Sequence, residues 1–445
     1  MEHKTVTVEE RPLRAFLVSL DSGPPSQGES SAAGLSGGAS LARELRGLVH
    51  SLGLEIAAHE TLKVREHSSK YGMGTGKARE LAEKAGELQA DCMVVDWDPS
   101  PSQQRNWETL SGIPMVDRQE LIIKIFADRA STREAELQVR LAELSYSLPR
   151  LAHKYIDLSR QRGGRYGTRG SGETRLELDR RQVERRIQQL REELKEVRRQ
   201  RQLQRRQRKR QGIFVCALVG YTNAGKSSLM NVLTGADLAA EDKLFVTLDA
   251  VSRRFELSRG FPVILVDTVG FIRNLPHALV NAFHATLEEA ALADLLIHVA
   301  DASDPDMEDC RQTTLQVLQS LGAGDIPMIT VFNKIDKLSG SYAGTPLPQG
   351  QGAVEDAGIP ILAPDTPIPI SVHQGWGLEE LKKRMREFLS GTRLCFHFSP
   401  DRGDLIGLLH RKGQVITESW DDGGIRVEAW VGRRLAGQLR QYLVR

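Results

Sequence analysis

The feature that most constrains this 445-residue chain is the stretch GYTNAGKSS, from Gly220 to Ser228. It fits the pattern G-x-x-x-x-G-K-[ST] and lies between an apolar run, residues 213–219, and a segment with helical spacing that stops at Gly235. Between a strand and a helix, such a loop holds phosphates with its backbone amides and with the helix N-terminus. We expect Lys226 to reach the β- and γ-phosphates and the Ser227 hydroxyl to bind Mg²⁺.

Further motifs follow downstream in the order that a nucleotide-binding α/β domain requires. The apolar run 261–266 ends in D-x-x-G, so we expect Asp267 to hold Mg²⁺ through water and the Gly270 amide to meet the γ-phosphate. Thr247 is the hydroxyl expected to close over Mg²⁺ when the γ-phosphate is present. The stretch NKID, residues 333–336, indicates guanine, because its carboxylate can accept two N–H donors that adenine does not present.

The last element of the candidate site is the stretch ISVHQGWG, in which the backbone amides of Ser371 and Val372 can meet the guanine O6. The expected ligands are therefore GTP and Mg²⁺. The predicted residues are, for catalysis, Lys226, Thr247 and Gly270; for the metal, Ser227, Thr247 and Asp267; and for the nucleotide, Gly220, Asn223, Ala224, Gly225, Lys226, Ser227, Ser228, Asp267, Gly270, Asn333, Lys334, Asp336, Ser371 and Val372.

The residue that follows D-x-x-G is Phe271. Ras-like enzymes place at this point the glutamine that orients the attacking water. Because an apolar ring cannot hydrogen-bond that water, we expect slow hydrolysis by the free protein and an outside element that completes the site.

A basic region precedes the nucleotide domain. Residues 131–210 hold 23 Lys+Arg against 11 Asp+Glu, whereas the whole chain has a net charge of only +2. Apolar residues recur every three or four positions from Leu137 to Leu151 and at heptad spacing from Leu176 to Val197. This pattern predicts an antiparallel helical hairpin with coiled-coil packing, and its charge indicates a polyanionic partner.

The two predicted arms are joined by SRQRGGRYGTRGSGET, residues 159–174. Arginines bind phosphates, glycines let the chain follow irregular surfaces, and a tyrosine can stack on an unpaired base. We expect this tip to contact RNA; a solvated loop is the alternative. The basic tail 198–211 is either a second polyanion contact or a solvated helix. The residues expected to touch RNA are Arg160, Arg162, Arg165, Tyr166 and Arg169.

Both ends of the chain predict smaller domains. Before residue 128, strand-like and helix-like runs alternate, which indicates a small α/β domain. The turn Gly72–Lys77 lacks the spacing of a phosphate-binding loop and is predicted to be a plain strand-to-helix turn. From about residue 392 the order strand, helix, strand, turn, strand, helix indicates an α+β unit without a catalytic constellation. The Gly-rich stretches 22–40 and 338–366 are expected to be surface loops.

Composition narrows the cellular setting. Four scattered cysteines without metal-ligand spacing suit a reducing compartment. No run approaches about 18 consecutive apolar residues, and the N-terminal stretch lacks the apolar region of a signal peptide. We therefore expect a cytoplasmic protein that does not insert into a membrane and that is a monomer.

These residues together resemble the HflX family of translational GTPases over essentially the whole chain. The resemblance is carried by DWDPSPSQQRNWE, RGSGETRLELDRR and DTVGFIRNLPH, together with the phosphate-binding loop and NKID. It implies an N-terminal α/β domain (1–127), a helical-hairpin linker (128–210), a G domain (211–390) and a small C-terminal α+β domain (391–445). It also implies GTP hydrolysis, binding to the large ribosomal subunit and the 70S ribosome through rRNA, and ribosome splitting or rescue, notably under stress.

The resemblance leaves open points. Some family members use ATP through the N-terminal domain, which would give the Gly72–Lys77 turn a role. The family's S-A-K is Ser371-Val372-His373 here, which keeps the backbone amides but alters the third side chain. A GTPase of large-subunit assembly and a non-ribosomal switch are alternatives. A non-enzymatic RNA-binding protein is a third, against which Lys226, Ser227 and Asp267 argue.

Overall fold

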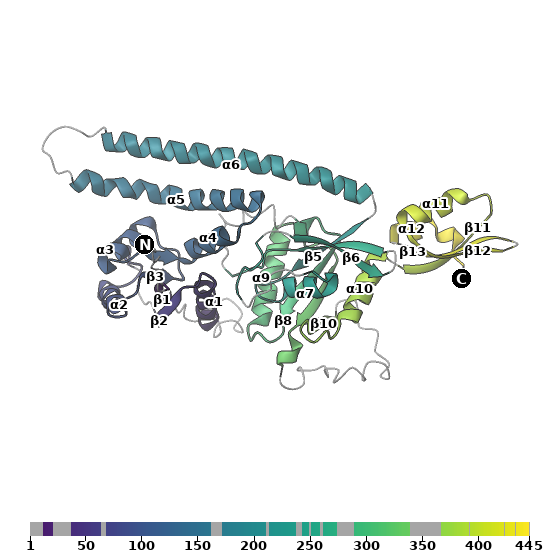
Figure 1. The fold of residues 1–445 in the computed structure, drawn as a ribbon, viewed down its shortest axis with the longest axis horizontal. Coiled ribbons are helices and arrows are strands. Elements are labelled where there is room, and N and C mark those ends of the chain that lie inside the picture. Colours follow the sequence, from purple (N-terminus) through teal and green to yellow (C-terminus); the bar gives the residue numbers. More distant parts are fainter. Residues whose placement is uncertain are drawn as a thin grey trace, which may run out of the picture. The chain divides into compact units, whose positions relative to one another are not determined.

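The chain forms two compact units in the computed structural model (Figure 1). The first contains residues 1–197 with the short segments 242–246 and 273–283, and the second contains the rest. The structure describes residues 12–20, 37–63, 68–161, 171–210, 213–236, 243–248, 251–258, 261–273, 289–338, 366–390, 392–421, 423–431 and 433–444.

The first unit starts with a four-stranded parallel sheet in the order β2-β1-β3-β4. Helices alternate with its strands, as the sequence predicted for an α/β domain. Trp107 is fully buried in its core and donates a hydrogen bond from Nε1 to the Tyr71 carbonyl at 3.0 Å. The elements are β1 (Arg14–Leu20), α1 (Gly37–Ser51), β2 (Glu55–Leu62), α2 (Thr75–Glu87), β3 (Cys92–Val95), α3 (Pro101–Ser111), β4 (Met115–Asp117) and α4 (Arg118–Arg129).

Helix α3 begins with a capping box. The Ser100 side chain accepts from the Gln103 amide, the Gln103 side chain accepts from the Ser100 amide, and Pro101 occupies the first turn. These are standard signals of a helix start. The segment Gly72–Lys77 leads into α2, where Lys77 pairs with Glu80 at 2.6 Å. An ATP role for this turn stays a prediction.

Two long helices form the predicted hairpin. They are α5 (Arg133–Gln161, 29 residues) and α6 (Ser171–Arg210, 40 residues), which lie side by side in Figure 1. Their seam is the expected apolar one, with buried Leu137, Leu141, Ile187, Leu190 and Leu194.

The helices extend beyond the apolar runs Leu137–Leu151 and Leu176–Val197 from which they were predicted. The expected tip segment, 159–174, is therefore helical at both of its ends, and the basic tail 198–210 continues α6. Arg160 lies in the last turn of α5, although its side chain is outside the described part. The expected RNA contacts Arg162, Arg165, Tyr166 and Arg169 also lie outside the described residues.

A buried polar network joins α5 to the end of β4. Asp117 is 1% exposed; its Oδ1 accepts from the Glu120 amide at 2.7 Å, which caps α4. Its Oδ2 accepts from the Tyr146 hydroxyl and from Arg150 Nη2, both at 2.8 Å. The Arg150 guanidinium also lies 3.6 Å from the centre of the Tyr146 ring. Burial raises the pKa of Asp117, and these hydrogen bonds oppose that effect.

The second unit contains a six-stranded sheet in the order β10-β9-β8-β5-β7-β6. Its strands are parallel except β6, which pairs antiparallel with β7 at the edge and was not predicted from the sequence. The elements are β5 (Phe214–Val219), α7 (Lys226–Thr234), β6 (Val251–Ser258), β7 (Phe261–Asp267), β8 (Leu295–Asp301), α9 (Met307–Ser320), β9 (Met328–Asn333), η1 (Ile335–Lys337), β10 (Ile368–Pro369) and α10 (Leu378–Ser390).

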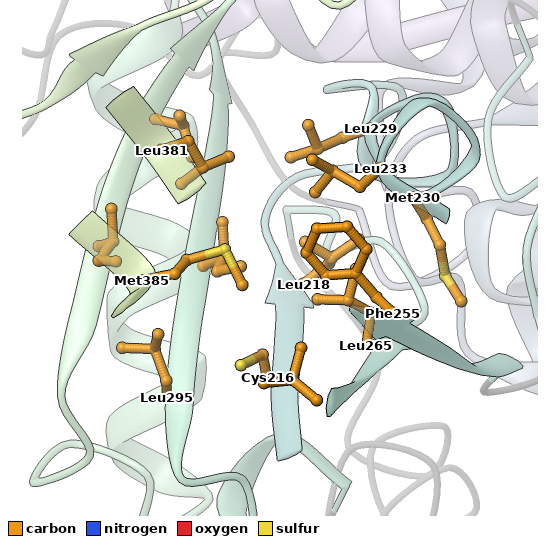
Figure 2. Close-up of a cluster of buried hydrophobic side chains, with 14 of the residues drawn as sticks. Cys216, Leu218, Leu229, Met230, Leu233, Phe255, Leu265, Leu295, Leu381 and Met385 are labelled. Carbon is orange, nitrogen blue, oxygen red and sulfur yellow. The ribbon is translucent and has the colours of Figure 1, made fainter. Parts of the chain in front are cut away.

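The core of this sheet lies under the candidate site. Figure 2 shows Cys216 and Leu218 of β5 among side chains from α7 and α10, including Leu229 and Met385. Central parallel strands are covered on both faces, which explains why β5 and β8 are nearly continuous apolar runs. Cys216 is fully buried, and burial raises the pKa of its thiol.

The chain ends in a three-stranded antiparallel sheet in the order β11-β13-β12. The elements match the predicted order, so the α+β prediction is confirmed. Phe396, Phe398 and Val427 are fully buried in its core. The elements are β11 (Thr392–Phe398), α11 (Gly403–Lys412), β12 (Gln414–Asp421), β13 (Gly424–Val431), α12 (Arg433–Gln438) and η2 (Arg440–Tyr442). Among the helices that the structure describes, none is both long and apolar enough to cross a membrane.

Candidate nucleotide-binding site

The phosphate-binding loop connects β5 to α7 with a backbone that only small residues permit. Gly220 has a φ of 148°, and a Cβ there would lie 2.2 Å from the Val299 carbonyl oxygen. Gly225 has a φ of 96°, and a Cβ there would lie 2.3 Å from Asn333 Nδ2. Asn223 also has a positive φ, 60°. The loop delivers the chain to the N-terminus of α7, whose first amides have no partner within the helix and suit an anion.

Lys226 is held ready for phosphates. It is 6% exposed, and its Nζ donates to the carbonyl oxygens of Gly220 at 3.1 Å and Tyr221 at 2.8 Å. Burial lowers the pKa of Lys226 to about 8, and the charge of Asp267 opposes this shift. Phosphate oxygens beside this ammonium would favour its charged form.

The three predicted metal ligands come together. Ser227 Oγ donates to Asp267 Oδ2 at 2.6 Å and lies 2.7 Å from Thr247 Oγ1. Asp267 is fully buried, and burial raises the pKa of its carboxyl group against the opposing effect of Lys226. Its Oδ1 is buried without a hydrogen-bond partner among the described residues. Two hydroxyls beside a carboxylate with one unmatched oxygen fit Mg²⁺, which prefers oxygen ligands.

Two backbone hydrogen bonds connect the D-x-x-G turn to the phosphate-binding loop. A Cβ on Gly270 would lie 2.6 Å from Thr222 Cα, so glycine is required there. The Thr222 amide donates to the Phe271 carbonyl at 2.8 Å, and the Phe271 amide donates to the Gly220 carbonyl at 3.1 Å. The Phe271 side chain is 1% exposed and packs in a core with Val219. Its ring is therefore a packing group, and it does not face the phosphates.

The base-reading residues are tied to the same loop. Asn333 Nδ2 donates to the Ala224 carbonyl at 2.9 Å, and Asn333 Oδ1 accepts from the Val372 amide at 3.2 Å. Ser371 Oγ donates to Asp336 Oδ1 at 2.6 Å, which orients this exposed carboxylate. The sequence analysis placed these residues together, and the structure does the same. Ser228, also predicted, lies in the first turn of α7 and is half-buried.

The sequence analysis missed one residue of the site, Asp301, which pairs with Lys334. Lys334 donates from Nζ to the Asn223 carbonyl at 2.9 Å and pairs with Asp301 at 2.7 Å. Asp301 ends β8, next to the strand that carries NKID. The only sequence signal was an aspartate at the carboxyl end of a buried strand. Its contact spans 33 positions of the sequence, which no local pattern reveals.

A guanine nucleotide suits both ends of this site, since its phosphates match the buried lysine and its base matches the Asp336 carboxylate. The chain is therefore a P-loop GTPase. Comparison with known protein families shows which kind of GTPase this is. Three family descriptions match consecutive parts of the chain. They are "GTP-binding GTPase N-terminal" over residues 39–127, "GTP-binding GTPase Middle Region" over 129–208 and "50S ribosome-binding GTPase" over 215–334.

Relatives agree over nearly the full length. The GTPase HflX of Akkermansia muciniphila is 44% identical over 442 residues, which cover 97% of each chain. The GTPase HflX of Caldanaerobacter subterraneus is 41% identical over 433 residues, 97% of this chain and 94% of that one. The chain thus belongs to the HflX family of GTPases. A GTP-binding protein from Sulfolobus solfataricus, solved with GDP, matches 85% of this chain and 99% of its own at 23% identity and a TM-score of 0.44.

Proposed function

We propose that this GTPase binds the large ribosomal subunit and splits or rescues 70S ribosomes, notably under stress, in the cytoplasm. The observation that supports this most is the helical hairpin. Its apolar seam is buried between α5 and α6. Residues 131–210, which include both helices, carry 23 basic residues against 11 acidic ones. At about 1.5 Å per residue, α5 alone is roughly 43 Å long, so the hairpin can carry arginines far from its own base.

The residues of the nucleotide site divide the chemical work. Lys226 binds the β- and γ-phosphates, and the Gly270 amide meets the γ-phosphate. Mg²⁺, held by Ser227, Thr247 and Asp267, would neutralise charge that develops on the phosphates. Thr247 belongs to a segment outside the regular elements, and its Oγ1 lies 2.7 Å from Ser227 Oγ, so this segment can close over Mg²⁺ when the γ-phosphate is present.

Hydrolysis depends on the ribosome in this proposal. The buried Phe271 ring cannot orient the attacking water, so the large subunit supplies the ordering. Elements supplied by a partner accelerate related GTPases by about 10³–10⁵-fold. Purified large subunits should therefore raise the steady-state rate by orders of magnitude, and an unchanged rate would refute ribosome-dependent hydrolysis.

The hairpin tip performs the contact with rRNA. We infer this role for Arg160, Arg162, Arg165, Tyr166 and Arg169, because arginines bind phosphates and the tyrosine can stack on a base. Each phosphate contact should make the slope of log affinity against log salt more negative by roughly 0.7–0.9.

A triple variant, Arg162→Ala, Arg165→Ala and Arg169→Ala, tests the splitting role. Light scattering of 70S ribosomes with GTP should show lost subunit separation, while basal GTP turnover stays unchanged. A matched control removes three exposed arginines of α6, Arg180, Arg181 and Arg186. Splitting at the normal rate by the tip variant would refute its role. Binding to immature large subunits without any splitting would instead favour an assembly GTPase.

A further inference from the structure

The C-terminal sheet has two edge strands, of which β11 is partly covered by a bridge between Phe396 and Leu443. Strand β12 pairs with β13, the central strand, and with no second strand in the described part of the chain. Residues 416–420 are all exposed, so both faces of this strand are open to solvent. Natural edge strands are commonly blunted by lysine, proline or a bulge, because unpaired backbone groups invite another strand. Strand β12 contains neither lysine nor proline.

The bulge limits the open edge to the second half of the strand. The register shifts between Val415 and Thr417, and from Thr417 to Asp421 the pairing with β13 is regular. This regular stretch contains Trp420, whose side chain is 72% exposed, more than any other large apolar side chain that the structure describes. Ile416, at the bulge, is 41% exposed.

Trp420 lies on the apolar side of the sheet. It is paired with Ile425, which is 1% exposed, and residues directly opposite in antiparallel strands share a face. The helices cover Ile425 but leave Trp420 in solvent. A tryptophan in this position is an anchor of the kind that dominates protein interfaces, beside a row of unpaired backbone groups.

The charge around the strand selects the partner. Residues 414–431 carry four acidic side chains and one basic one, Arg426, which is exposed on β13 opposite Ser419. Glu418 is exposed on β12 and hydrogen-bonded to His410 of α11. Acidic groups repel phosphates and attract basic protein segments. The net charge of this surface is therefore opposite in sign to that of the basic hairpin.

We propose that β12 is a docking strand for an extended, basic segment of a protein of the large ribosomal subunit. The segment adds beside Thr417–Asp421 by backbone hydrogen bonds and covers Trp420 and Ile416. This inference rests on the proposed ribosome binding, and it divides the labour: the hairpin contacts RNA, whereas the C-terminal sheet contacts protein.

Two variants test the docking strand in the full-length protein with a GTP analogue and purified large subunits. Trp420→Ala should weaken binding about tenfold or more, as truncation of a central tryptophan does. Glu418→Lys should also weaken it if the partner is a basic protein, and should strengthen it if the partner is RNA. Phe388→Ala is the matched control, because Phe388 is an exposed aromatic residue of α10, 37% exposed. Basal GTP turnover should be unchanged in all three.

A photocrosslinking benzoylphenylalanine in place of Trp420 identifies the partner class. Capture of a basic ribosomal protein supports the inference, whereas crosslinks to rRNA alone, or none on bound subunits, overturn it. Unchanged affinity of both variants also overturns it. Failure of the unaltered protein to bind subunits at all would instead refute the proposed function, so the two failures are distinguishable.

Discussion

Strands β4 and β7, one in each of the two larger sheets, both end in a buried aspartate, and the two carboxylates have different surroundings. Both oxygens of Asp117 accept hydrogen bonds, from Glu120, Tyr146 and Arg150. One oxygen of Asp267 has no partner among the described residues. Burial raises the pKa of both carboxyl groups, so burial does not distinguish them. A carboxylate with both oxygens hydrogen-bonded within the protein stabilises the fold. One with an unbonded oxygen can still bind a ligand.

The largest effect is expected at a third carboxylate, which is exposed and held at one oxygen by Ser371. Asp336→Asn should reduce the preference for guanine by about 10⁴-fold, because the amide cannot accept both donors of the base. The variant should gain affinity for xanthosine triphosphate, which presents an acceptor there. Titrations with both nucleotides measure this, with Asp401→Asn as a control at an exposed site. Unchanged preference would show that Asp336 does not read the base.

Asp117→Ala tests the saturated carboxylate. We expect the free energy of unfolding to fall by about 3–5 kcal/mol, because the Glu120 amide, the Tyr146 hydroxyl and the partly buried Arg150 guanidinium all lose their shared acceptor. Urea unfolding of the nucleotide-free protein measures the change. Basal GTP turnover at a temperature where the variant stays folded should be that of the unaltered protein. A second substitution, Arg150→Met, should restore part of the stability, and no restoration would argue against the ion pair.

Asp267→Asn tests the unmatched oxygen and should give the reverse result. Turnover at saturating GTP should fall about 10²–10³-fold, the range seen when one group that stabilises a transition state is removed. Stability should fall less than in Asp117→Ala, because the amide keeps an acceptor for Ser227 and the removal of a desolvated charge offsets the lost attraction to Lys226. Turnover and urea unfolding measured on the same preparation decide the comparison. A loss of stability as large as that of Asp117→Ala would abolish the distinction drawn here.

A smaller effect follows from Lys226. Burial lowers its pKa to about 8 in the free protein, and phosphates require its charged form. Above pH 8, GTP binding must therefore take up a proton, and the affinity should fall by up to about tenfold per pH unit. Calorimetry between about pH 7 and 9 measures this dependence. Guanosine, which lacks phosphates, is the control, and an equal dependence for both ligands would exclude Lys226 as the titrating group.

How far the sequence predicts this site depends on the range of each contact. The loop Gly220–Ser228 and NKID were found because their function requires residues at fixed local spacing. Asp301 was missed because its bond to Lys334 crosses from one strand to the next. Asp117 was missed for the same reason, since Arg150 lies 33 residues away.

The fold shows a similar division. The hairpin was predicted from its apolar period, but its helices run into the Gly- and Arg-rich segment, where that period stops. Strand β6 was missed because the stretch between the phosphate-binding loop and β7 was considered only for the Thr247 hydroxyl. Helix α3 carried a readable start, a serine followed by proline with glutamine three positions on, although the helix has only Trp107 buried and hence little apolar periodicity.

Cys216 is a chemical reporter of local opening in the six-stranded sheet. Its thiol is fully buried in β5 and its pKa is raised, so an alkylating reagent can reach the reactive thiolate only when the sheet opens. The other three cysteines are half-buried and lie on other elements. The modification rate at Cys216 therefore reports how often the strand under the phosphate-binding loop separates from its neighbours. Nucleotide bound to this loop should lower the modification rate of Cys216 by the factor by which it stabilises the closed sheet.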